Sequence, residues 1–474
     1  MQPAVLKIAA SRPYLPHQAG PVNHFHHLAF RLAIAPLFCC KDECIVVKCH
    51  CFLGGLRRRK KMGRTWRLDW TKAILSSVAV FFLVANVSKA KYSGGTGEPN
   101  DPYRIATPND LNDIGNHVED FNKCFVMVND INMSDITGTQ FNIIGNFTTP
   151  FTGIFDGNSH TIMNFTYGIS YAGGSLFGVA DGQTATIKNL TMADAGVNEP
   201  GDTYVACLVS QLKQGQVSNC HVINGTVRAE NYTGLLVGIS SSRISNCSAS
   251  GVCSANEYAG GLVGCMLENA TVTDCISDVN VMVVFDGAGG LVGVHDGNLI
   301  TNSCSFGPVT GGRGKIGGLV GSNGSTIQKC YSNSEVIGGH DEAIGGLVGD
   351  NSGSILRCFS TGSVSGVIDV GGLVGSNVSG SYTKCFWDSD VNPDVNGIGN
   401  GSDPNVIGKT TVEMMTESTF TDAGWDFVEV WGIGEGQTYP FLRVYPAGDL
   451  NHDGIVNFMD VAILADHWLE GAAP

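Results

Sequence analysis

The feature that most constrains the fold of this chain is a short glycine-rich motif, GGLVG or a close variant, that returns about every 28 residues. The motif's leucine marks eight successive copies: Leu176, Leu208, Leu236, Leu262, Leu291, Leu319, Leu347 and Leu373. A unit of this length cannot bury its own apolar side chains, so neighbouring copies must stack on one another. The chain is therefore a repeat protein, and its length does not indicate a number of separate globular domains.

Two further columns keep step with the leucine. The first is Leu190, Cys220, Cys247, Cys275, Cys304, Cys330, Cys358 and Cys385, and the second includes Val252, Val281, Val309, Val336 and Val364. Three short β-type segments per repeat, separated by Gly, Ser and Asn, are typical of one coil of a three-sided β-helix. We expect an all-β fold, a right-handed parallel β-helix of about eight or more coils with its strands about 4.8 Å apart. Glycine pairs in every coil and the lack of a helical period exclude an α-solenoid.

The repeat resembles a known family. GGLVG, a following segment such as Ser325–Ser332 and a third such as Gly362–Gly366 are similar to the GLUG repeats of bacterial surface and secreted proteins. The resemblance covers roughly residues 165–390. It implies a β-helix in an adhesin-like protein, and the family has no agreed catalytic residues.

We expect residues 171–390 to form the repeat array, between a cap with the first coils at 91–170 and a C-terminal cap at 391–446. Thr107–Asp110 has the N-cap, Pro and acidic residues of a helix start, and Thr410–Glu413 matches a capping box. Four bulky side chains are expected to close the last coil: Trp425, Phe427, Trp431 and Phe441.

Residues 62–90 have the order of a secretory signal peptide: basic residues, the apolar run Ala73–Ala85, and small residues at Ser88 and Ala90. We expect cleavage after Ala90, which leaves no transmembrane anchor and a protein that is secreted, extracellular or on a bacterial cell surface. The apolar run is short for a spanning helix, although an uncleaved anchor is the alternative.

Residues 1–61 are basic, contain five cysteines and show no repeat. We interpret them as an upstream segment translated from an early start codon, with Met62 as the start of the exported protein. A small metal-binding module is the alternative, but the cysteine spacing matches no CxxC pair.

Charge divides the chain in two. Residues 1–90 contain 14 Lys and Arg against 3 Asp and Glu, whereas residues 91–474 contain 14 against 40. An acidic body repels phosphate backbones, so we expect no nucleic-acid partner. It favours solubility and the binding of cations.

The expected mature region contains eleven cysteines, an odd number, in a compartment where disulfides are common. Bridges between adjacent coils are one reading. Parallel stacking, however, keeps Cβ atoms about 4.8 Å apart, beyond the usual disulfide range of about 3.5–4.5 Å. We therefore favour a ladder of buried thiols that act as small apolar groups.

Catalytic motifs are absent from the sequence: it contains no HExxH, GxSxG or phosphate loop, and Asp and Glu are scattered over the turns. Polysaccharide-cleaving β-helices need carboxylates at a defined separation. We read the polar residues after GGLVG, namely Asn323, Asp350, Asn351 and Asn377, as turn residues. We expect no enzyme activity.

Tyr204, Tyr232 and Tyr258 stand four residues before the register leucine in three consecutive coils. Stacked coils would place them in one row, next to Asp202, Glu230 and Glu257. An exposed aromatic row beside hydrogen-bonding groups could hold an extended sugar chain. The alternative is an aromatic stack that only stabilises neighbouring strands.

Residues 449–460, DLNHDGIVNFMD, have the spacing of an EF-hand-type loop. The expected calcium ligands are Asp449, Asn451, Asp453, the carbonyl of Ile455, Asn457 and Asp460. The segment 447–474 resembles one type I dockerin repeat, which implies Ca²⁺ as cofactor and a cohesin-like partner. A dockerin has two repeats and this segment one, with Phe458 and Met459 where small hydroxyl residues usually contact cohesin.

Together these features predict a secreted, non-catalytic, calcium-binding β-helix protein for adhesion or glycan binding. Its expected partner is a cell-surface or plant- or algal-type polysaccharide. An accessory component or enzyme of polysaccharide degradation, and a structural surface-layer protein, are the alternatives.

Overall fold

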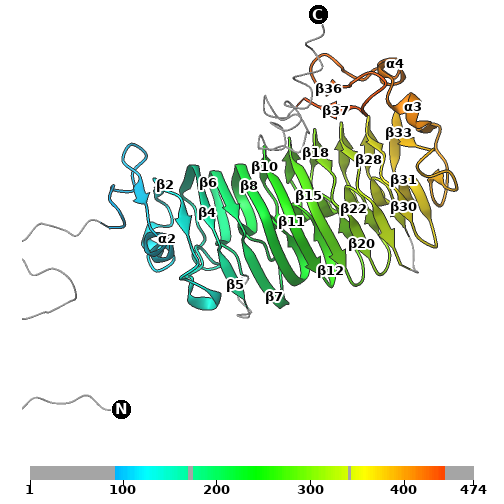
Figure 1. Cartoon of the computed structure of the whole chain (residues 1–474). Coiled ribbons are helices and arrows are strands. Elements are labelled where there is room, and N and C mark those ends of the chain that lie inside the picture. Colours follow the sequence, from blue (N-terminus) through cyan, green and yellow to red (C-terminus); the bar gives the residue numbers. More distant parts are fainter. Residues whose placement is uncertain (1–90, 169–173, 340–342, 444–474) are drawn as a thin grey trace, which may run out of the picture. The chain divides into compact units, whose positions relative to one another are not determined.

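A computed structural model describes residues 91–443 apart from 169–173 and 340–342 (Figure 1). These residues form a parallel β-solenoid of about 10 turns with little helix, two more than the GGLVG motif marks. The predicted fold class is thus confirmed. The segments expected to be an upstream region, a signal peptide ending at Ala90 and a calcium loop at 449–460 lie outside the described residues.

The strands fall into groups by their place in the coil. Those that follow the register leucine are β9 (Val237–Ser240), β13 (Val263–Met266), β17 (Val292–His295), β22 (Val320–Asn323), β27 (Val348–Asn351), β31 (Val370–Asn377) and β34 (Asn396–Ile398). Those on the next face are β1 (Tyr103–Ile105), β2 (Cys124–Met127), β10 (Arg243–Ser245), β14 (Thr271–Thr273), β18 (Leu299–Thr301), β23 (Thr326–Gln328), β28 (Ser354–Leu356) and β32 (Ser381–Thr383).

Strands after the cysteine column make the remaining face. They are β3 (Ile131–Asn132), β5 (Thr166–Gly168), β7 (Gly196–Thr203), β11 (Ser248–Ala255), β15 (Ile276–Val283), β19 (Cys304–Ser305), β20 (Val309–Gly311), β24 (Tyr331–Ser332), β25 (Val336–Gly338), β29 (Phe359–Ser360), β30 (Val364–Ser365), β33 (Cys385–Asp388) and β35 (Val406–Lys409). Short strands before the motif are β12 (Glu257–Gly260), β16 (Ala288–Gly289), β21 (Ile316–Gly317) and β26 (Ile344–Gly345), and strands that run through corners are β4 (Ile154–Met163), β6 (Phe177–Ala193) and β8 (Val209–Gly234).

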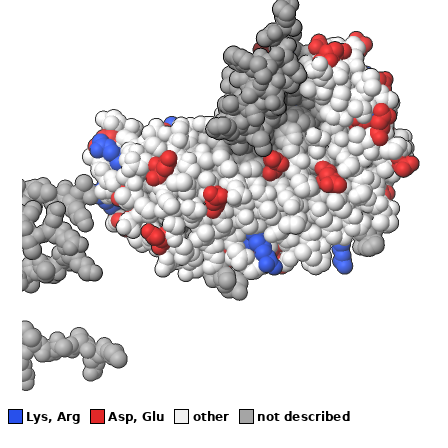
Figure 2. Space-filling view, viewed as in Figure 1, with Lys and Arg blue, Asp and Glu red and all other residues white. Residues whose placement is uncertain are grey.

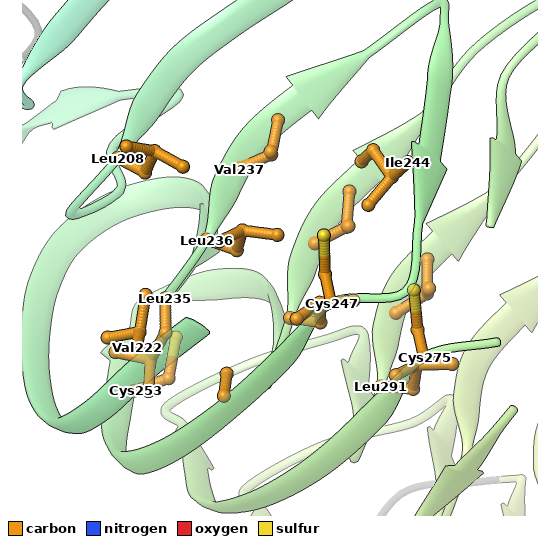
Figure 3. Close-up of a cluster of buried hydrophobic side chains, with 14 of the residues drawn as sticks. Leu208, Val222, Leu235, Leu236, Val237, Ile244, Cys247, Cys253, Cys275 and Leu291 are labelled. Atoms are coloured by element: carbon orange, nitrogen blue, oxygen red, sulfur yellow. The ribbon is translucent and has the colours of Figure 1, made fainter. Parts of the chain in front are cut away.

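Interior ladders hold the coils together. One ladder runs Phe177, Val209, Val237, Val263, Val292, Val320, Val348, Val374 and Ile398, each residue paired with the next. Another runs Phe125, Phe155, Ile187, Val217, Ile244, Val272, Ile300, Ile327, Ile355 and Tyr382. These side chains are buried, and Figure 3 shows Leu236, Val237 and Ile244 directed into the space that the coils enclose. Each buried rung stabilises the stack by about 1.5–3 kcal/mol.

The second glycine of the motif allows the coils to approach closely. A Cβ atom on Gly261 would collide with the carbonyl oxygen of Gly290 in the next coil, and the same holds for Gly290 against Gly318. A side chain here would push two coils apart. Glycine is therefore required at this position in the coils that contain GGLVG, whereas Ser175, Cys207 and Leu235 occupy it in the first three coils.

The cysteine column differs from the prediction in one coil. Ser303, not Cys304, stands in register with Cys275 and Cys330, because Thr301 pairs with both Thr273 and Gln328. The Ser303 hydroxyl donates to the carbonyl oxygen of Thr301 at 2.8 Å, the bond that each column thiol makes to the residue two before it. The assignment of Cys304 to the column was therefore wrong. Ser303 and Cys304 are adjacent and both small, so the spacing of residues in the sequence does not show that a turn in this coil differs in length by one residue.

The valine column differs in the same way at one position. Cys253 pairs with Val227 and Val281 and is fully buried, whereas Val252 pairs with Thr226 and Asn280 and is only half-buried. A bulge between Ala249 and Gly251 shifts the register by one residue. The remaining predicted valines do form one ladder.

All eleven described cysteines are free thiols, in agreement with the favoured reading. Ten are buried and Cys124 is half-buried. Burial raises the pKa of Cys207 and Cys265 to about 12, so these sulfurs stay protonated and uncharged at neutral pH.

Helix α2 (Pro108–Ile114) covers the first coil. Its start has the predicted N-cap at Thr107, and the structure adds a capping box, in which Thr107 Oγ1 accepts from the Asp110 N–H and the Asp110 carboxylate accepts from the Thr107 N–H. Leu111 and Ile114 are fully buried in the core of the solenoid. Two 3₁₀ turns follow, η1 (Val118–Asp120) and η2 (Gly138–Gln140).

The C-terminal segment lies along the side of the coils instead of closing the last one. Helices α3 (Thr411–Met414) and α4 (Glu417–Thr421) and the antiparallel pair β36 (Trp431–Gly432) and β37 (Phe441–Leu442) carry it (Figure 1). It covers an outward column of apolar residues: Ile276, Cys304, Tyr331, Phe359 and Phe386. Trp425 and Trp431 pack on Phe359 with ring centroids 6.2 and 5.8 Å apart. The apolar outer column explains why these aromatics lie there, because they bury one another.

Asp388 fastens this segment to the array. Its buried carboxylate accepts hydrogen bonds from the hydroxyls of Tyr439 and Thr411, at 2.7 and 2.8 Å, and from the backbone N–H of Asp390 and Val391. The predicted capping box at Thr410 and Glu413 begins α3. Four donors satisfy a buried charge that would otherwise cost several kcal/mol, about the penalty for an unpaired ion.

Candidate functional site: the tyrosine corner

One corner of the coil takes a left-handed backbone in every repeat. The residue four before the register leucine has a φ between 41° and 81° in seven consecutive coils: Tyr204, Tyr232, Tyr258, Gly287, Lys315, Ala343 and Asp369. This region is unfavourable for bulky side chains and easy for glycine. Tyrosine in three neighbouring coils therefore opposes the backbone preference, which indicates that the ring itself has a role.

The three predicted tyrosines form one stack. The ring centroids of Tyr204 and Tyr232 lie 5.4 Å apart with planes 19° from parallel, and those of Tyr232 and Tyr258 lie 5.0 Å apart at 9°. All three side chains are half-buried. The expected row thus exists, but the facing surfaces of the rings cover one another. A ligand can reach only the ring edges, the hydroxyls and the ends of the stack.

The phenol groups are available as uncharged donors and acceptors. Burial raises the pKa of Tyr232 and Tyr258, and the negative charge of Glu257 raises both further. Within the described part of the chain, no group hydrogen-bonds to the three hydroxyls. Each of the three hydroxyls in the row can bond a sugar hydroxyl.

The row ends at Gly287. This glycine has a φ of 81°, and a Cβ atom on it would collide with Cδ1 of Tyr258. Its bare backbone lies against the ring and leaves Tyr258 space to stack. Within the row, the backbone of Tyr232 lies against Gly264 of the next coil, where a Cβ atom would collide with the Tyr232 carbonyl carbon.

The acidic residues beside the row fall into two columns instead of one. Glu257 pairs with Asn231, which pairs with Thr203, so Glu257 is one residue out of step with Asp202 and Glu230. Asn231 Oδ1 is buried and accepts no hydrogen bond from the described residues. The polar edge of the site thus combines carboxylates, an amide and a threonine hydroxyl.

The polar column after GGLVG is structural, as the sequence indicates. Asn323 Nδ2 donates to Asn351 Oδ1 at 2.7 Å between coils, and each asparagine also bonds the backbone two residues on. His295 stands in the same column, in register with Asn323. These amides fix the corner, whereas Asp350 pairs with Ser322 and Ser376 in the neighbouring column and is half-buried.

A cluster of metal-ligand type lies at the N-terminal cap. Donor atoms of His117, Glu119 and Asp120 lie within 4.8 Å of one another. The Lys91 ammonium, however, already pairs with Glu119 and Asp120 at 2.9 and 2.6 Å. Its hydrogen bond to Glu119 lowers the pKa of that carboxyl to about 2. The positive charge that these carboxylates bind is therefore the ammonium group of Lys91.

Sequence reasoning missed the surface next to Tyr204. A hollow of about 460 Å³ opens there, and its lining includes Phe147, Val179, Asp202 and Gln211. Phe147 precedes the first clear repeat, so no period links it to the tyrosines. The only signal in the sequence is a phenylalanine within a polar Asn-Phe-Thr-Thr turn.

Charge on the described surface is sparse. Figure 2 shows Asp and Glu side chains scattered over the visible face instead of gathered into one patch. No helix in the described ranges is long and apolar enough to cross a membrane.

Comparisons with known proteins reach only part of the chain. A protein of Evansella cellulosilytica, inferred to be a Gly-rich membrane protein, is 29% identical over 168 residues, 33% of this chain and 16% of its own. Halomucin of Haloquadratum walsbyi is 33% identical over 156 residues, 31% of this chain and 2% of its own. The chain thus spans less than a fifth of the length of these relatives.

No protein-family model matches the chain, so neither the GLUG nor the dockerin resemblance has a matching model. Among solved structures, a protein of Bacteroides ovatus inferred to be an immunoglobulin A1 protease has a TM-score of 0.46 at 18% identity, covering 75% of this chain and 96% of that one. The fold assignment rests on the strand pairing of the chain itself: it is a β-helix repeat protein.

Proposed function

We propose that this chain is a non-catalytic β-helix protein of the cell surface or extracellular space, which binds an extended glycan along the tyrosine row. The observation that carries the proposal is the row itself: three tyrosines in consecutive coils at a backbone conformation that disfavours them. Their neutral hydroxyls repeat at the spacing of the coils and lie next to carboxylate and amide groups.

The partial relatives support this location. Both carry names of the surface type, a Gly-rich membrane protein and a halomucin, although this chain matches only a small part of each. The GLUG-like repeats and the signal-peptide pattern ending at Ala90 point the same way. Export would bring the solenoid to the compartment where polysaccharides lie.

The proposal includes one calcium ion in the loop 449–460, held by the oxygens of Asp449, Asn451, Asp453 and Asp460 with Ile455 and Asn457. Calorimetry on the full chain should detect one calcium site. The double substitution Asp449→Ala with Asp453→Ala should abolish it, and equal calcium uptake by that variant refutes the assignment. The dockerin-like pattern further suggests a cohesin-type module as partner, which a pull-down with and without calcium tests.

Glycan binding is tested with an array of neutral and acidic oligosaccharides. The full chain should bind, and Tyr232→Ala should weaken binding roughly three- to tenfold, the range for one aromatic contact. Lys315→Ala is the matched control, because Lys315 occupies the same left-handed corner outside the row. No binding by the unaltered chain, or equal binding by Tyr232→Ala, would make the stack a scaffold of a structural surface protein.

A further inference from the structure

The hollow beside Tyr204 combines aromatic and hydrogen-bonding groups. It has a volume of about 460 Å³, and three coils contribute to it: Ile143 to Phe147 before β4, Val179 of β6, Asp202 to Tyr204 at the end of β7, and Gln211 of β8. Small-molecule sites are commonly of this size, mostly apolar with a few placed polar groups. Tyr204 belongs both to this hollow and to the stack.

Phe147 is an exposed ring on a fixed turn. Its side chain is 68% exposed, yet Asn146 holds the turn: Asn146 Oδ1 accepts from the N–H of Thr148 and Thr149, and Asn146 N–H donates to the Thr149 carbonyl. Lys213 Nζ lies 4.7 Å from the ring centroid on one face. Because the backbone of the turn is already fixed, a ligand that packs on the ring has to order only the side chain of Phe147.

We propose that this hollow is a second glycan subsite, which takes one uncharged sugar ring of the chain that lies on the tyrosine row. The inference rests on the proposed function. The apolar face of a pyranose packs against Phe147 and Tyr204, and its hydroxyls bond the Asp202 carboxylate and the Gln211 amide. The Asp202 carboxylate in the lining opposes a uronic acid, because like charges at close range are unfavourable.

Titration of the full chain with neutral gluco-, manno- and xylo-oligosaccharides tests the subsite. For whichever of these three oligosaccharide types binds, Phe147→Ala should weaken the affinity for both the disaccharide and the hexasaccharide roughly three- to tenfold. Phe285→Ala is the matched control, because Phe285 is also exposed and also carries a cation, Arg313, at 5.4 Å from its ring. Both variants should melt near the unaltered chain, since the substitution of an exposed side chain usually changes stability little.

The two sites fail in different ways. Tyr232→Ala should weaken binding of the hexasaccharide but leave binding of the disaccharide unchanged, because a disaccharide with one ring in the hollow does not need a contact with Tyr232. Equal disaccharide binding by Phe147→Ala and Phe285→Ala overturns the subsite and leaves the row standing. Loss in Phe147→Ala with no loss in Tyr232→Ala overturns the row instead. Asp202→Asn should strengthen oligogalacturonide binding, and unchanged binding overturns the preference for uncharged sugars.

Discussion

The ring of Tyr258 stacks on that of Tyr232 with centroids 5.0 Å apart and planes 9° from parallel, about the distance between neighbouring strands. Each ring therefore stands directly over its equivalent in the adjacent coil, and the stack has the pitch of the solenoid. The same geometry stabilises the corner and presents a regular row of phenols. Stability and binding have to be measured separately.

Two substitutions at Tyr232 separate the stabilising contacts of its ring from the strain of its left-handed backbone. Tyr232→Ala should lower the free energy of unfolding by about 1–2 kcal/mol, because it removes two ring contacts and a half-buried side chain. Tyr232→Gly should be less destabilising than Tyr232→Ala, because a left-handed backbone costs an L-residue about 1–2 kcal/mol. Urea unfolding of both variants checks the order, and a glycine variant less stable than the alanine variant contradicts the strain argument.

Gly287 should tolerate no side chain. Gly287→Ala combines an unfavourable φ with a collision against Tyr258, whereas Gly424→Ala has a similar φ of 78° and no atom within 4 Å of its new Cβ. We expect Gly287→Ala to be more destabilising by about 1–3 kcal/mol, the usual range for overpacking. Thermal unfolding measures the difference. The extra destabilisation of Gly287→Ala should disappear when Tyr258 is also replaced by alanine. If it persists in that double variant, the collision with the Tyr258 ring is not its cause.

Position 303 belongs to the cysteine column and position 304 does not. Ser303→Cys should be nearly neutral, because six coils already hold a thiol in this place and the Cys275 N–H can keep a sulfur acceptor. Cys304→Ser should destabilise by about 1–3 kcal/mol, because it puts a hydroxyl into the buried apolar column that the C-terminal segment covers. Comparison of unfolding midpoints tests this, and equal losses for both exchanges would contradict the register.

The sequence was enough for the fold because its pattern is periodic. The leucine, valine and cysteine columns predict stacked coils, and the N-cap at Thr107 and the capping box at Thr410 predict two helix starts that the structure contains. The errors at Val252 and Cys304 lie where a bulge or a turn changes length by one residue. Periodicity fixes which residues stack, but not how turns of unequal length shift them.

The candidate site was only partly predictable for a related reason. A common register places Tyr204, Tyr232 and Tyr258 in one row, which the structure contains, while their role in binding stays a prediction. Burial of the ring faces depends on the left-handed corner, which no composition reveals. The hollow depends on how the atypical turn at Phe147 meets the first regular coils, and nothing repeats there to indicate it.

Acid sensitivity should arise from His295. The ring is buried, its Nε2 donates to the Thr326 carbonyl at 3.1 Å, and its Nδ1 has no partner among the described residues. Burial lowers the pKa of His295 to about 4, below its usual 6.5. The unfolded chain then binds more protons than the folded one between these values, so stability is full above about pH 6.5 and falls as the pH drops towards 4. The expected loss is about 3 kcal/mol.

His295→Asn should remove this loss. Asn323 and Asn351 already form an amide ladder in the same column, and an asparagine at 295 extends it by one coil without a titrating group. Urea midpoints measured from pH 7 to pH 4 should stay flatter for His295→Asn than for the unaltered chain. His160→Asn is the control, because His160 lies near the surface beside Asp130 and should leave the acid limb as it is. An unchanged pH dependence in His295→Asn would mean that another group causes the acid limb, such as His221, whose pKa is also lowered by burial.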